Sequence, residues 1–129
     1  MPTQKIVNVT LPYPPSDLFP NRKLGWQKKM LATRQARNDA YLAGLVQGDR
    51  KDLPMNSVFM VIVWYYPSRH IPDWDSIYRA TKPIVDGGLV DAGYLVEDSP
   101  KVIKGVLLLK GGIDKDNPRT EFYLTEGGW

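Results

Sequence analysis

Apolar and polar residues follow patterns along the chain that predict four strands. Residues 5–11 alternate between the two kinds, as expected for a strand with one buried face. Residues 56–67 are almost continuously apolar and rich in β-branched side chains, which predicts a strand covered on both faces. The segments 101–110 and 119–125 also have strand-like composition, and a turn containing glycine, asparagine and proline separates them.

The segments between the first three predicted strands favour helices. The best part of the first helix runs from Thr33, its expected N-cap, to Gln47. Residues 24–31 fit either an extension of this helix or a short strand. Residues 76–90 predict a second helix, with Ser76 as its N-cap. The order β-α-β-α-β-β indicates an α+β fold, an α/β-type mixed sheet of about four strands packed with two main helices.

Length and composition narrow the class of protein. The chain of 129 residues has room for one small domain, residues 1–129. It contains no cysteine, which excludes disulfides, thiolate nucleophiles and cysteine-based zinc sites. It begins with no signal-peptide pattern, and no apolar run reaches the length of about 20 residues that spans a membrane. We therefore expect a cytoplasmic protein with no membrane partner.

The net charge of +3 conceals an uneven distribution of charge. Residues 1–53 hold nine Lys and Arg against four Asp and Glu, whereas residues 54–129 hold eight against ten. Six of those ten acidic residues lie between Asp73 and Asp98. A basic first part indicates a polyanionic partner such as nucleic acid, and the acidic segment is the candidate for chemistry.

The sequence Asp73-Trp74-Asp75 is the centre of this acidic segment. In an extended backbone, side chains two positions apart point the same way. Asp73 and Asp75 would then share one face, with Trp74 directed to the core. Two carboxylates on one face suit a hard cation such as Mg²⁺. The alternative is a solvated pair of acidic residues at the end of a strand.

The predicted helix after this pair carries a stripe of charges. Counted from Asp75, a helix brings Arg79, Lys82 and Asp86 to one side. A cation close to metal-bound carboxylates can stabilise charge that develops on a phosphate. Asp86 is interpreted as a structural partner of Lys82. Pro83 removes a backbone hydrogen bond, so we expect it to kink the helix or split it in two.

A second acidic point lies in the loop before the third predicted strand. If this loop returns beside Asp75, either Glu97 or Asp98 completes a metal site. Lys101 would then reach a phosphate.

Taken together, these blocks resemble the RusA family of Holliday junction resolvases, many of which come from phages and prophages. The resemblance begins with VTLPYPPSDLFPNR, continues through the D-x-D pair and a basic residue on the next helix, and ends with LVDAGYLVEDSPKVI. It covers most of the chain, in matching order and spacing. It implies a homodimer in a bacterial or phage-infected cell that uses Mg²⁺, with Mn²⁺ as the alternative ion. Such an enzyme nicks two symmetric strands of a four-way DNA junction during recombination and repair.

The resemblance also assigns roles to residues. Asp73, Asp75 and Asp98 match the three metal-binding aspartates of the family. The family's catalytic lysine follows the second aspartate by four positions, where this chain has Arg79. Lys82 is the alternative match if three residues are inserted, and lysine suits a compact contact to phosphate or water. We favour Lys82, with Arg79 as the second candidate for the catalytic cation.

Basic side chains along the chain are assigned to DNA phosphates, which would make binding strongly salt-dependent. These residues are Arg22, Lys23, Lys28, Lys29, Arg34, Arg69 and Lys101. Two other functions fit the same features: a non-catalytic protein that binds junctions or other DNA, and a metal nuclease directed at flaps or replication forks.

Overall fold

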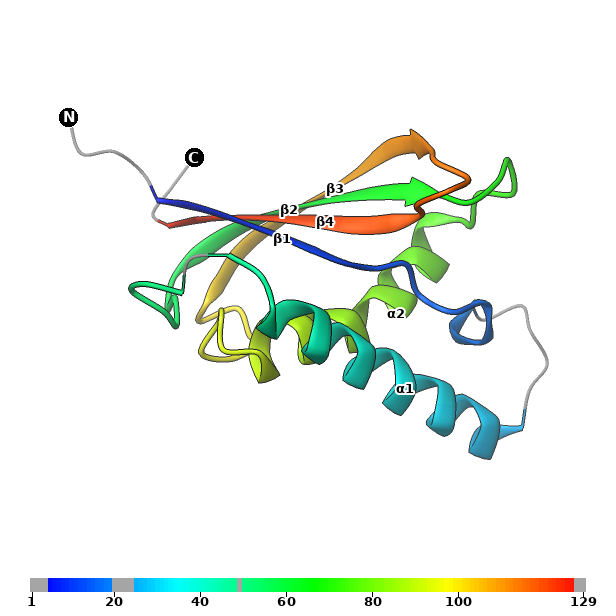
Figure 1. Cartoon of the computed structure of the whole chain (residues 1–129), viewed down its shortest axis with the longest axis horizontal. Coiled ribbons are helices and arrows are strands. Elements are labelled where there is room, and N and C mark those ends of the chain that lie inside the picture. Colours follow the sequence, from blue (N-terminus) through cyan, green and yellow to red (C-terminus); the bar gives the residue numbers. More distant parts are fainter. Residues whose placement is uncertain (1–4, 20–24, 49, 127–129) are drawn as a thin grey trace.

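The computed structural model describes residues 5–19, 25–48 and 50–126, which form one four-stranded sheet and a layer of helices (Figure 1). In sheet order, the strands are β1 (Ile6–Pro12), β4 (Arg119–Glu126), β2 (Val58–Tyr66) and β3 (Ile103–Ile113). β4 pairs antiparallel with β1 and β2, whereas β2 and β3 are parallel. The helices are the short 3₁₀-helix η1 (Ser16–Leu18), α1 (Trp26–Leu45), α2 (Trp74–Val85) and the π-helix η2 (Asp86–Asp91). The predicted α+β fold and order of elements are confirmed.

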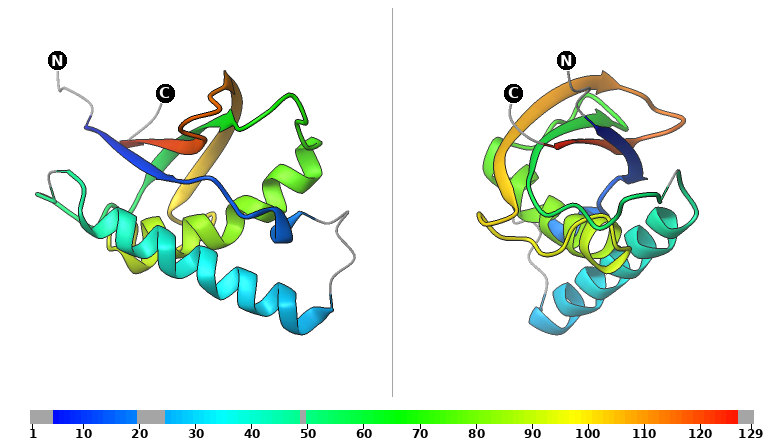
Figure 2. Two further views of the ribbon diagram at one scale, coloured as in Figure 1. Left: turned by 45° about the vertical axis from the view of Figure 1, so that its right-hand side comes forward. Right: turned by 90° about the vertical axis from the view of Figure 1, so that its left-hand side faces the viewer.

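The helices cover only one face of the sheet (Figure 2). Burial therefore alternates along β2: Val58, Met60 and Ile62 are buried, whereas the residues between them are half-buried. The prediction that this strand is covered on both faces is wrong. A continuous apolar run does not reveal whether a second layer exists, and here both main helices lie on the same side of the sheet. No helix in the described ranges is long and apolar enough to cross a membrane.

Small residues allow α1 and η2 to cross with their backbones in contact. Ala36, Ala40 and Gly44 form the buried stripe of α1. A Cβ atom added at Gly44 would lie 2.6 Å from the carbonyl oxygen of Gly88, and one added at Gly87 would overlap the carbonyl group of Arg37. The crossing is consequently too close for side chains larger than hydrogen at these glycines.

Both helices begin earlier than expected. α1 starts at Trp26 after Gly25, so residues 26–31 of the undecided segment 24–31 belong to it, whereas residue 24 lies outside the described residues. Thr33 is not an N-cap, because it lies inside α1 and its hydroxyl donates to the carbonyl of Lys29. α2 runs without interruption through Pro83, and η2 follows it directly. The predicted split of this helix is therefore wrong.

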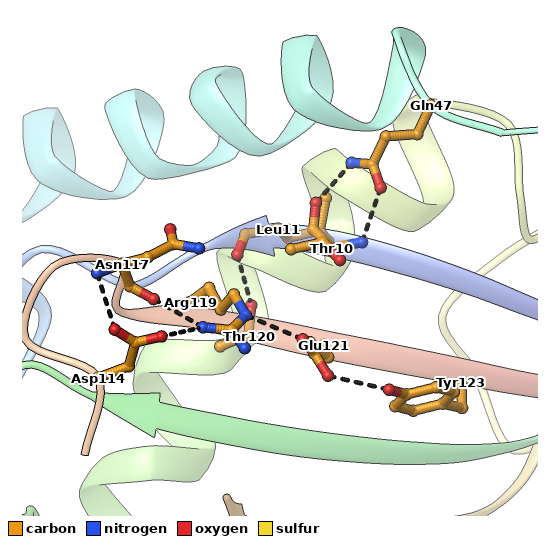
Figure 3. Close-up of polar contacts among 9 residues, drawn as sticks. All are labelled: Thr10, Leu11, Gln47, Asp114, Asn117, Arg119, Thr120, Glu121 and Tyr123. Atoms are coloured by element: carbon orange, nitrogen blue, oxygen red, sulfur yellow. Dashed lines mark hydrogen bonds and ion pairs between the residues drawn. The ribbon is translucent and has the colours of Figure 1, made fainter. Parts of the chain in front are cut away.

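Two groups of side-chain hydrogen bonds lie close together on β1 and β4, where Thr10 pairs with Glu121 (Figure 3). The amide of Gln47, just after α1, accepts from the backbone N–H of Thr10 at 2.8 Å and donates to the carbonyl of the same residue. Arg119, at the start of β4, donates to Asp114 and Glu121 at 2.7 and 2.9 Å. These bonds tie α1 to β1 and close the connection between β3 and β4.

The close backbone contact between α1 and η2 leaves no space for a methyl group at Gly87. We expect Gly87→Ala to lower the free energy of unfolding by about 2–3 kcal/mol, because the added methyl group must push α1 and η2 apart. Urea denaturation followed by circular dichroism measures this change. Gly25→Ser is the control, since open space surrounds Gly25 and serine is a good N-cap. Equal stability of Gly87→Ala and the parent protein would contradict the expectation.

Candidate functional site

Asp73 and Asp75 lie at the N-terminus of α2 and not on an extended strand. Asp73 is the N-cap, and its Oδ1 accepts a hydrogen bond of 2.8 Å from the backbone N–H of Ser76. Asp75 is in the first helical turn, with its side chain 82% exposed. The predicted extended pair and the predicted N-cap at Ser76 are both wrong, because an aspartate that satisfies a free N–H starts the helix at this point. Trp74, expected in the core, is 54% exposed.

The environment of Asp73 favours its charged form. Hydrogen bonds from the backbone N–H and the side chain of Ser76 hold the pKa of the Asp73 carboxyl below its ordinary value, and the positive charge of Arg79 acts in the same direction. The N-terminal end of the helix dipole also favours negative charge. Both carboxylates are thus placed at a terminus that suits anionic side chains.

The predicted stripe of charges is confirmed, and it runs along α2 to Asp86, the first residue of η2. Arg79 lies 3.6 Å from the carboxylate of Asp75, and the Nζ of Lys82 lies 3.0 Å from Oδ1 of Asp86. The pairing of Asp86 with Lys82 is the structural role expected for this aspartate.

The loop after η2 returns to α2 and brings Asp98 into contact with Lys82. The ammonium of Lys82 donates to Oδ2 of Asp98 as well as to Asp86. These hydrogen bonds, above all the one to Asp98, raise the pKa of Lys82 against the opposing effect of burial. Glu97 is exposed, whereas Asp98 is half-buried. Of the two acidic residues in this loop, Asp98 is the one that joins the charged stripe.

Asp73, Asp75 and Asp98 were expected to meet around one ion. Among residues 5–19, 25–48 and 50–126, no three Asp, Glu or His side chains lie close enough together to hold a metal ion. Asp98 is engaged by Lys82 and Asp75 by Arg79. Carboxylate oxygens are the type of ligand that Mg²⁺ prefers. Two of these three carboxylates, however, already form ion pairs with cationic side chains. The metal site stays a prediction.

Three cationic side chains from two helices surround one small hollow of about 230 Å³. Lys29 comes from α1, whereas Arg79 and Lys82 come from α2. The rest of the lining is Asp17 and Leu18 of η1, Thr33 and Pro83. We call this space the basic hollow. Three positive side chains around a space of this size suit a phosphate group.

The other basic residues assigned to DNA lie at the surface and do not gather at the basic hollow. Exposed side chains are found at Lys28, Arg34, Arg69 and Lys101. Arg22 and Lys23 lie outside the described residues. Of the predicted DNA contacts that the structure describes, Lys29 alone lines the basic hollow.

The contribution of η1 to the basic hollow was missed in the sequence. Asp17 and Leu18 follow two prolines and a serine. This combination predicts a turn, but it does not indicate which other elements the turn contacts. Their position opposite α2 depends on tertiary packing. The sequence feature that could have indicated a functional role for this loop is VTLPYPPSDLFPNR, the first block that resembles the RusA family.

No protein-family model matches the chain. Over 121 aligned positions, it is 30% identical to a protein of Xylella fastidiosa (strain Temecula1 / ATCC 700964) that is described as uncharacterized. The match covers 85% of this chain and 79% of the relative. The two proteins belong to one family. The description of the relative states no activity.

Removal of the Asp73 cap should destabilise α2. We expect Asp73→Ala to lower the urea midpoint near neutral pH, whereas Asp73→Asn retains most of the stability because asparagine also caps helices. The folded-state pKa of Asp73 is lowered, so its ionisation stabilises the protein above the ordinary pKa of about 3.9 and ceases to do so as the pH falls through the folded value. The gap between Asp73→Ala and the parent should therefore shrink between about pH 7 and pH 3.

Proposed function

We propose that this chain is a Mg²⁺-dependent endonuclease of the RusA type that resolves four-way (Holliday) DNA junctions by paired symmetric nicks. The observation that carries the proposal is the basic hollow, because two of its three cations, Arg79 and Lys82, also contact carboxylates. A site that offers positive charge to a phosphate and carboxylates beside it has the groups that phosphodiester hydrolysis needs. The order of the sequence blocks supports the RusA family.

In this mechanism the phosphate to be cleaved lies in the basic hollow, where Lys29 and Arg79 bind its oxygens. Lys82 leaves Asp98 for the phosphate and stabilises the charge that develops on it. Its departure frees a carboxylate of the predicted metal set, so binding of DNA and of the ion would assist each other. Asp73, Asp75 and Asp98 would hold Mg²⁺, and the ion would supply an acidified water and positive charge against the phosphate.

Lys82 is the better candidate for the catalytic cation. It contacts two carboxylates from different parts of the chain, Asp86 on the helix and Asp98 on the loop. Arg79 makes one longer contact, of 3.6 Å to Asp75. A compact ammonium held between two carboxylates is already positioned for exchange with a phosphate oxygen.

A homodimer follows from the symmetry of the substrate, because a two-fold dimer places one site at each of two symmetric strands. The face of the sheet opposite the helices supports it. Val61 and Val63 of β2 are half-buried there, and their neighbours in β3, Leu107 and Leu109, are 46% and 42% exposed. Exposed apolar patches of this kind often mark contact surfaces between proteins. The proposed partners are thus branched DNA and a second copy, in the cytoplasm of a bacterial or phage-infected cell.

Cleavage of a labelled four-way junction tests the proposal. With Mg²⁺, the parent protein should produce paired symmetric nicks, and Asp75→Asn should abolish them while still binding the junction. Lys82→Met should reduce the single-turnover rate by about 100-fold or more, the effect of losing one stabilising group. Arg79→Met should cost less. Lys115→Met, in the turn between β3 and β4, is the matched control and should cleave like the parent.

Two outcomes would replace the proposal with a rival. Junction binding without any Mg²⁺- or Mn²⁺-dependent cleavage would indicate a non-catalytic DNA-binding protein. Faster cleavage of flaps or forks, without paired nicks in the junction, would indicate a different structure-specific nuclease. Unchanged cleavage by Asp75→Asn would remove that carboxylate from the mechanism.

The dimer has a test of its own. Leu109→Glu places a charge on the uncovered face of the sheet and should convert a dimer to a monomer in size-exclusion chromatography with light scattering. Val96→Glu is the control, since Val96 is 50% exposed in the loop after η2 and lies off this face. A parent protein that is monomeric at every concentration tested would contradict the expectation.

A further inference from the structure

A larger hollow of about 610 Å³ lies beside the start of α2, apart from the basic hollow. It is formed by the loop after β1 and by the loop that joins β2 to α2. The side chains that matter for its chemistry are Tyr13, Ser16, Phe19, His70 and Ile71. We call this space the aromatic hollow. Its lining combines flat apolar surfaces with a few polar groups, the usual composition of a ligand pocket.

The aromatic wall of this hollow is supported from behind. The ring of Tyr13 packs edge-on against buried Trp64, with 5.2 Å between ring centroids. Phe19 contacts the rings of both Tyr13 and Trp64, at 6.3 and 6.4 Å. Pro14, Pro67 and Pro72 in the two loops restrict the backbone. The wall is therefore formed before any ligand arrives.

The polar groups of the aromatic hollow are available to a ligand. No described residue forms a hydrogen bond with the ring of His70 or with the hydroxyls of Tyr13 and Ser16. Burial, together with Tyr66, raises the pKa of Tyr13 to about 12, so its phenol keeps its proton at neutral pH. The hollow thus offers a hydroxyl donor and an imidazole beside two aromatic rings.

The aromatic hollow borders the start of α2, where two of the proposed metal ligands lie. His70, Ile71 and Pro72 line it, and Asp73 follows them directly in the sequence. Three extended residues span about 10 Å. In the proposed complex, Asp73 and Asp75 hold the ion beside the cleaved phosphate. A nucleotide of the same strand on the side of Asp73 is therefore within reach of the aromatic hollow.

We propose that the aromatic hollow takes one unpaired nucleobase from the strand next to the cleaved phosphate. The base stacks against Tyr13 and Phe19, and His70 reads its polar edge. Enzymes that extrude a base hold it in this manner, by stacking and by hydrogen bonds to its edge. The inference rests on the proposed nuclease function and adds to it: the aromatic hollow selects which base lies at the cut, and so sets the sequence preference of cleavage.

A double-mutant cycle of binding affinities, which combines a protein substitution with an abasic nucleotide in the DNA, tests the proposal. It is measured without metal, so that the junction is not cleaved. Junction affinity is measured by fluorescence anisotropy for the parent protein and for Phe19→Leu, which keeps an apolar side chain but removes the stacking surface. Each protein is compared on an intact junction and on junctions with one abasic nucleotide at each branch-point position in turn. Phe19→Leu should weaken binding to the intact junction about tenfold. At one abasic position the parent should lose the same amount, and Phe19→Leu should lose nothing more.

His70→Ala provides a second readout, because this exposed residue can be changed with little effect on folding. It should alter the preferred base at the cut when a set of junctions of different sequence is cleaved with Mg²⁺. Equal losses for Phe19→Leu on intact and all abasic junctions, or no binding of the junction by the parent, would overturn the proposal. The parent protein could make paired nicks while every abasic junction binds it as tightly as the intact junction does. That result would exclude the proposed role of the aromatic hollow but would agree with the nuclease function.

Discussion

The ammonium group of Lys82 lies between two carboxylates, and the arrangement of the candidate site depends on this contact. Asp86 comes from the same helical surface, whereas Asp98 comes from a loop that returns from the far side of η2. The side chain of Lys82 is 60% exposed, and exposed ion pairs contribute only about 0–1 kcal/mol to stability. The contact therefore orients the loop more than it stabilises the fold. A weak, solvated contact of this kind can also exchange one anionic partner for another.

Packing remote from the charges determines where they meet. The backbone contact between α1 and η2 at Gly44, Gly87 and Gly88 fixes how closely the two helices approach. Arg37 adds a hydrogen-bonded ion pair to Asp91 on η2, at 2.6 Å. Because α2 runs directly into η2, this crossing also sets the distance between Lys29 on α1 and the cations of α2. The geometry of the basic hollow thus depends on glycines that do not line it themselves.

The sequence was sufficient for the elements and for the stripe of charges, because both depend on local periodicity. It failed where two local rules competed. Asp73 and Asp75 read as an extended pair, but the capping preference of aspartate was stronger, and α2 began at Trp74. The apolar run of β2 could not reveal that the helices of the described residues all lie on one face of the sheet. The contact of Lys82 with Asp98 was not predicted. The return of this loop beside Asp75 was a condition of the predicted metal site, and a contact between residues 16 positions apart depends on tertiary packing.

The amide of Gln47 has a further consequence for how the protein behaves at high concentration. β1 is an outer strand, and the N–H and C=O of Thr10 on its open side are the groups that an incoming strand from another molecule would use. Gln47 supplies an amide donor and an amide acceptor to them, much as a neighbouring peptide group would. Gln47 thereby blocks the pairing of another molecule's strand with β1 at Thr10.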